Sequence, residues 1–299
     1  MHRRLLLAAP LALPFLARRA AAQGAPMPVV ASFSILGDMV RQVGGERVAV
    51  RVLAGPDADA HAFQPRPADA AAVRDARLVV SNGLGFEPWL DRLLRSAGQR
   101  GTVAVASAGI RPRAMAEEGH GHSHGQDPHA WQDLNHGRAY VRTIAAALAA
   151  ADPTGAEDYR SRATAYDARL AALDGWVRAQ IASVPEARRK VVTSHDAFGY
   201  FAAAYGVQFL APQGVSTDSE PSAAQVGRLV RLLKQQGITA LFLENMANPA
   251  TLKRLAAEAG VTVSGQLYAD ALSGPGGPAP DYEAMFRHNV GLLVPAMRG

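Results

Sequence analysis

Short apolar segments alternate with stretches of helical periodicity along the whole chain, and this alternation constrains the fold more than any other feature. Short apolar strands separated by crossover helices are typical of parallel sheets that are covered on both faces. We therefore predict an α/β fold made of two Rossmann-like lobes. The predicted strands are 29–33, 48–53, 78–81 and 103–106 in the first half, and 191–193, 207–210, 240–243 and 261–267 in the second.

A long amphipathic pattern separates the two halves. Apolar residues from Tyr159 to Val184 recur at steps of three and four, which predicts one helix of about 45 Å at about 1.5 Å per residue. A single small domain needs no helix of that length. We interpret residues 153–185 as a rigid helix that joins an N-terminal lobe, 23–152, to a C-terminal lobe, 186–299; a core helix of one larger domain is the alternative.

One further helix is marked at both ends by its sequence. Ser219 is placed to cap it and Pro221 fits its first turn, while Gly237 ends it. Between them, apolar residues at 226, 229, 230 and 233 form one face.

The N-terminus has the pattern of a secretory signal peptide over residues 1–22. Arg3 and Arg4 precede an apolar run too short to span a bilayer, and three alanines end the segment. The paired arginines fit either the general or the twin-arginine export route. Cleavage would remove four arginines, so the formal charge of +5 would fall to about +1, which argues against a nucleic-acid partner. We expect a periplasmic monomer with no stable membrane insertion, because no later apolar stretch reaches about 20 residues.

The chain contains no cysteine but 9 histidines. A disulfide scaffold, a cysteine-based zinc finger, an iron–sulfur protein and a thiol enzyme all require sulfur and are excluded. Any metal site must therefore be built from nitrogen and oxygen ligands.

Four polar residues follow the carboxyl ends of predicted strands, two in each half: His61, His129, His195 and Asp270. Ligands of open α/β sheets bind outside those ends, so two facing lobes would bring the four residues to one inter-lobe cleft. Three imidazoles and a carboxylate form a complete tetrahedral set for Zn²⁺. Candidates to orient the ring nitrogens are Asp196, Glu220 and Glu244, although each can equally serve as helix-start charge or cap.

Residues 117–125 differ in kind from their surroundings. His120, His122 and His124 alternate with glycine and serine beside two glutamates, so the segment has no apolar face. We interpret it as a loop that captures metal weakly, with a plain solvated loop as the alternative. We assign no role to His136 or His288.

Several segments of the chain together resemble the zinc and manganese substrate-binding proteins of bacterial ABC transporters, the cluster A-I family. The resemblance covers essentially the whole chain after residue 22. It is carried by residues 59–65, 127–131, 193–201, 243–245 and 267–273. It implies two α/β lobes joined by one long helix, with the metal between them and the ligands at His61, His129, His195 and Asp270.

The resemblance also implies a function. Manganese members usually carry glutamate at the position of His195 and zinc members carry histidine, so we expect Zn²⁺ as the transported ligand in preference to Mn²⁺. The partners would be an ABC permease with its ATPase, and a periplasmic zinc chaperone is an additional candidate. We expect no enzyme activity. The alternatives are a manganese-binding homologue, a periplasmic zinc buffer, and a secreted zinc hydrolase with Glu220 or Glu244 as base.

Overall fold

The computed structural model describes residues 25–114, 126–215, 217 and 221–299. The predicted signal peptide and the histidine-rich segment lie outside these residues. The N-terminal half contains β1 (Met27–Phe33), α1 (Ser34–Gly44), β2 (Val48–Ala54), α2 (Pro67–Asp75), β3 (Leu78–Ser81), α3 (Leu90–Ala97), β4 (Thr102–Val105) and α4 (Leu134–Ala151). After α5 (Ala156–Ala182), the C-terminal half contains β5 (Lys190–Val192), α6 (Gly199–Tyr205), β6 (Gln208–Leu210), α7 (Ala223–Gln236), β7 (Phe242–Glu244), α8 (Pro249–Ala259), β8 (Gly265–Leu267) and α9 (Tyr282–Arg298).

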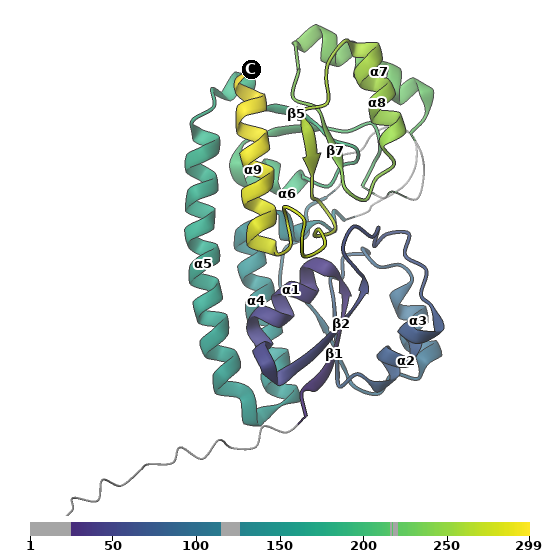
Figure 1. Cartoon of the computed structure of the whole chain (residues 1–299), viewed down its shortest axis with the longest axis vertical. Helices are drawn as coiled ribbons and strands as arrows, with labels where there is room; N and C mark the ends of the chain where they lie inside the picture. Colours follow the sequence, from purple (N-terminus) through teal and green to yellow (C-terminus); the bar gives the residue numbers. More distant parts are fainter. Residues whose placement is uncertain (1–24, 115–125, 216, 218–220) are drawn as a thin grey trace, which may run out of the picture.

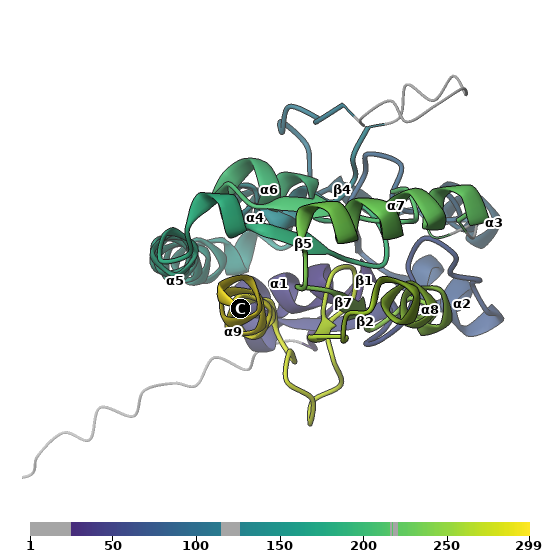
Figure 2. The same ribbon diagram turned by 90° about the horizontal axis from the view of Figure 1, so that it is seen from above.

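Parallel strands form the centre of each half, as predicted. In the first half they pair in the order β2-β1-β3-β4. In the second half β5 pairs with β6 and β7 pairs with β8, and a parallel bridge between Val192 and Leu241 links the two pairs. Seen from above, α6 and α7 lie on one side of these strands and α8 and α9 on the other (Figure 2). The two-lobe α/β fold is confirmed.

Helix α5 runs alongside both lobes (Figure 1). Its 27 residues correspond to about 40 Å at about 1.5 Å per residue. It packs against α1, α4 and α9, and its buried residues belong to one apolar core that contains Phe33 and Trp131 from the first half and Phe201 and Leu293 from the second. The helix therefore joins the lobes through a shared core as well as through the chain.

Two local predictions need correction. The helix expected from Ser219 begins at Ala223, and its N-cap is Ser222, whose Oγ accepts the backbone N–H of Gln225; Ser219 lies outside the described residues. The strand expected over 261–267 is limited to Gly265–Leu267, because β7 offers only three residues for pairing. The apolar residues before it, Val261 and Val263, pack instead against the core of α7 and α8.

A buried carboxylate lies where α1, α5 and α9 meet. Asp38 Oδ2 accepts the backbone N–H of Tyr282 at 3.0 Å and lies 3.5 Å from the hydroxyl of Tyr166. Burial outweighs these contacts and raises the pKa of Asp38 to about 6. A carboxyl group with a raised native pKa stabilises the fold below its ordinary pKa of about 4, and that contribution is lost as the pH rises through 6.

Asp38→Asn is expected to remove this pH dependence. The unfolding free energy of the variant minus that of the parent chain should increase by about 2 to 3 kcal/mol when the pH is raised from 4 to 7. This follows from a pKa raised by about two units at 1.36 kcal/mol each. Urea unfolding of both proteins at the two pH values measures the difference, with Asp91→Asn at an exposed position as the control. An equal difference at pH 4 and pH 7 would contradict the assignment.

Candidate metal centre

The two histidines of the N-terminal half are each held by an aspartate two positions earlier. Asp59 Oδ1 accepts the backbone N–H of His61 at 2.9 Å. Asp127 Oδ1 accepts the backbone N–H of His129 at 3.0 Å and also lies 2.9 Å from the Nδ1 atom of the same ring. Asp127 therefore fixes the position of the loop and the orientation of the ring. An Nδ1–H that points to a carboxylate leaves Nε2 free to bind a metal.

His195 is held in the same way from within the C-terminal half. It lies three residues after β5, and Glu244 at the end of β7 approaches it. Glu244 Oε1 accepts the backbone N–H groups of Ser194 and His195 at 2.8 and 3.0 Å. Its Oε2 lies 2.6 Å from His195 Nδ1. Here too the carboxylate directs Nε2 of the ring away from itself and toward the centre of the site.

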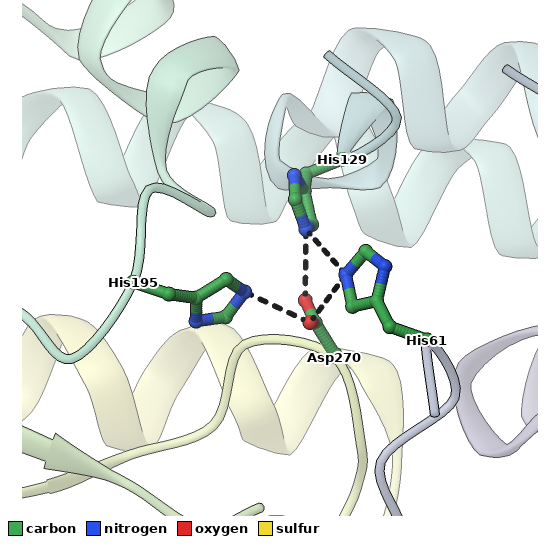
Figure 3. Close-up of side chains that lie close together, drawn as sticks. All are labelled: His61, His129, His195 and Asp270. Atoms are coloured by element: carbon green, nitrogen blue, oxygen red, sulfur yellow. Dashed lines mark hydrogen bonds and ion pairs between the residues drawn. The ribbon is translucent and has the colours of Figure 1, made fainter. Parts of the chain in front are cut away.

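Asp270 lies three residues after β8, and its carboxylate occupies the middle of the three rings (Figure 3). Its Oδ2 is 3.0 Å from His195 Nε2 and 3.3 Å from His61 Nε2, while Oδ1 is 3.5 Å from His129 Nε2. The Nε2 atoms of His61 and His129 are 3.3 Å apart. Within the described residues, Asp270 Oδ1 is buried and has no hydrogen-bond partner.

These spacings fit a single metal ion. Four ligands at about 2.0 Å around a tetrahedral Zn²⁺ lie about 3.3 Å from one another. The four ligand atoms of the site all lie within 4.8 Å of one another. The three distances from Asp270 to the Nε2 atoms, and the distance between the Nε2 atoms of His61 and His129, fall between 3.0 and 3.5 Å. All four side chains are buried, with His61 the most exposed at 6%. The site is therefore a buried cage of three imidazoles and one carboxylate whose ligand atoms lie close enough together to share one ion.

The charged groups of the cage shift one another's pKa. Burial alone would favour neutral groups, but the carboxylates of Asp270 and Asp127 raise the pKa of His129 to about 9. Burial is also outweighed at His195, where Glu244 and Asp270 raise the pKa well above its ordinary value. Conversely, His129 and His195 lower the pKa of Asp270 well below its ordinary value.

The structure thus brings together the four residues that the sequence singled out as ligands. Of the proposed orienting groups, Glu244 contacts a ligand, whereas Asp196 donates its backbone N–H to Gly214 O and Glu220 lies outside the described residues. His136 packs on Tyr200 and His288 on Tyr268, and neither belongs to the cluster of potential ligands. The histidines at 120, 122 and 124 also lie outside the described residues.

Sequence reasoning missed the role of Asp59 and Asp127. A signal was present, because both N-terminal ligands occur in an Asp-x-His pattern. An aspartate readily accepts the backbone N–H two residues later in an Asx turn. The repeated pattern could therefore have indicated two prearranged histidines.

Comparison with known proteins supports a metal-binding protein. A family profile described as "Zinc-uptake complex component A periplasmic" matches residues 29–296. The manganese-binding lipoprotein MntA of Halalkalibacterium halodurans is 34% identical over 91% of this chain and 88% of its own length. The zinc-binding protein TroA of Treponema pallidum is 32% identical over 95% of this chain and 92% of its own length.

Solved structures agree with these sequence relationships. The periplasmic zinc-binding protein TroA of Treponema pallidum superposes with a TM-score of 0.86 at 29% identity, over 92% of this chain and 100% of that one. A manganese-bound periplasmic metal-binding protein from Candidatus Liberibacter asiaticus superposes with a TM-score of 0.80 at 27% identity, over 90% of this chain and 98% of that one.

Proposed function

This chain belongs to the family of periplasmic zinc-uptake components, ZnuA, and from that premise we propose that it binds Zn²⁺ as cargo and delivers it to the permease of an ABC transporter. The chain is a metal-binding component of such a transporter and not an enzyme. The observation that supports zinc is the donor set: three imidazole nitrogens and one carboxylate oxygen lie within 4.8 Å of one another, and Zn²⁺ accepts this combination of ligands.

The choice between zinc and manganese depends on ligand chemistry, because the relatives include proteins named for either metal. Mn²⁺ favours oxygen-rich, octahedral sites, whereas Zn²⁺ is content with imidazole in a four-coordinate shell. Affinity for a given nitrogen-containing site also rises from Mn²⁺ to Zn²⁺ in the general order of divalent metals. A manganese-binding component is the second candidate, favoured by the name of MntA and by the second oxygen of Asp270, which also faces the rings.

The position of Glu244 does not support the alternative of a secreted zinc hydrolase in which this residue acts as the base. One oxygen of that carboxylate accepts the backbone N–H groups of Ser194 and His195, and the other lies 2.6 Å from His195 Nδ1. They lie on the Nδ1 side of the ring, whereas Nε2 faces the cage. A general base would instead have to reach a water molecule on the metal.

Several features beyond the cage belong to the same proposal. We place the mature chain in the periplasm as a monomer after removal of residues 1–22, where it passes the ion to the permease while the ATPase drives the transport cycle; a zinc chaperone is an additional candidate partner. His120, His122 and His124 would serve as auxiliary capture ligands. None of the helices in the described part of the chain combines the length and apolar character needed to cross a bilayer.

The proposal predicts that zinc binds at least about 100-fold more tightly than manganese, because nitrogen ligands favour zinc. Protein stripped of metal with a chelator should be titrated with each ion in competition with a fluorescent indicator of known affinity. One equivalent of zinc should bind. Equal affinities, or tighter binding of manganese, would reject the zinc assignment and favour the second candidate.

A further inference from the structure

The loop that carries Asp270 is fastened to the opposite half of the molecule. The carbonyl oxygen of Ala269, the residue before this ligand, accepts two hydrogen bonds from the N-terminal half. The donors are Trp131 Nε1 at 2.9 Å and Gln132 Nε2 at 2.8 Å. Both donors are buried, with Gln132 only 1% exposed.

Two more contacts continue the attachment on the other side of Asp270. The backbone N–H of Leu272 donates to Ser34 Oγ at 2.9 Å, and the carbonyl oxygen of Leu272 accepts the backbone N–H of Asp57 at 2.9 Å. From the C-terminal half, Asn289 holds Tyr268 through that residue's backbone N–H and carbonyl groups, at 3.0 and 2.7 Å. The backbone of Ala269 and Leu272 is therefore held from the N-terminal half, whereas Tyr268, and Ala271 through its carbonyl and Asn245 Nδ2 at 3.3 Å, are held from the C-terminal half.

The backbone around His195, unlike that around Asp270, forms its hydrogen bonds within its own half of the molecule. The backbone N–H groups of Ser194 and His195 donate to Glu244, and that of Asp196 donates to Gly214, all within the C-terminal half. Beside it, a cleft of ≈ 240 Å³ lies between the halves, lined by Asp59 from one side and by Ser194 and Met246 from the other. One hydrogen bond crosses the halves at this cleft, from Thr217 Oγ1 to Asp59 Oδ2 at 2.6 Å, whereas four hydrogen bonds hold the backbone of Ala269 and Leu272 from the N-terminal half.

We propose that Gln132 and Trp131 are positioning residues for the metal cargo, which make Asp270 move with His61 and His129 as one unit. The inference rests on the proposed metal-binding function. The turn that follows His129, Ala130–Gln132, supplies both donors, so the same short segment fixes one ligand directly and another through the carbonyl of Ala269. Opening of the cage would then begin by separation of His195 from the other three ligands.

Gln132→Met tests the proposal, because methionine has a similar volume and cannot donate. We expect zinc to dissociate about 10-fold faster, in line with the loss of a group that orients a ligand. We also expect the visible bands of Co²⁺ bound in place of zinc to change, because they report the geometry of the ligands. Gln235→Met on the exposed face of α7 is the matched control. Trp131→Phe, which removes the second donor, provides an independent variant if Gln132→Met folds poorly.

Asn289→Leu separates positioning from general destabilisation. It removes two buried hydrogen bonds rather than one, so it should lower the melting temperature more than Gln132→Met. If Asp270 is held from the N-terminal half, Asn289→Leu should nevertheless change zinc dissociation and the Co²⁺ spectrum less than Gln132→Met does. A larger effect of Asn289→Leu on both metal readouts, or no effect of Gln132→Met and Trp131→Phe, would overturn the proposal.

A measurement without added metal keeps the two proposals distinguishable. If the parent chain bound neither zinc nor cobalt, the proposed function would fail. Backbone amide exchange of residues 270–272 would still report the attachment, because exchange speeds up where local opening becomes easier. Faster exchange there in Gln132→Met, with little change at residues 194–196, supports the positioning role; unchanged exchange at 270–272 refutes it.

Discussion

Replacing Asp270 with alanine is expected to lower the zinc affinity of the chain about 100- to 1000-fold. Structural zinc sites with four protein ligands bind with about 10–16 kcal/mol, so one ligand accounts for about 3–4 kcal/mol, and each 1.4 kcal/mol is a factor of ten. Asp270 is also the only anionic member of the four, and its side chain is fully buried at 0% exposure. Its loss would leave a divalent cation among neutral rings in a site shielded from water.

Competition titration with a zinc indicator measures this effect, and His195→Ala should produce a loss of the same order. Asp91→Ala, at an exposed position on α3, is the control for the substitution itself. The melting temperature of each variant without metal shows whether the fold is retained. Zinc binding at full strength in both Asp270→Ala and His195→Ala would refute the cage as the cargo site.

The four residues of the cage could be found from sequence because each follows a strand. The carboxyl ends of parallel strands lie at one edge of a sheet, so the placement of His195 and Asp270 three residues beyond β5 and β8 follows from recognising the strands. The long helix was equally accessible, because Tyr159, Tyr166 and Ile181 keep their periodicity throughout α5 and are all buried. Local pattern and topology sufficed for both.

The contacts that orient and fasten these ligands could not be predicted in the same way. Gln132 meets the carbonyl of Ala269 across 137 positions of sequence, and nothing in either local segment specifies that pairing. The start of α7, by contrast, could have been found locally, although Ser219 and Ser222 are both suitable caps by residue type. Only Ser222 has Gln225 three positions later to complete the capping box.

Zinc binding is expected to release at least about one proton per ion at pH 7.5. His129, with a pKa raised to about 9, is protonated at that pH in the protein without cargo, and Glu244 and Asp270 shift the pKa of His195 in the same direction. A metal binds only the neutral ring. Affinity should therefore rise with pH by about tenfold per unit for each displaced proton, and the contribution of His129 should level off above about pH 9.

Ordinary imidazoles would behave differently, because a pKa near 6.5 leaves the rings neutral at pH 7.5 and gives an affinity that falls only below about pH 6. Calorimetric titration in buffers of different ionisation enthalpy counts the released protons directly. Asp127→Asn should reduce the count, because it removes a carboxylate 2.9 Å from His129 Nδ1, whereas Asp91→Asn should leave the count unchanged. A count near zero at pH 7.5 would show that Asp270 does not hold its neighbouring rings in the charged form, so zinc would meet a cage with no protons to displace.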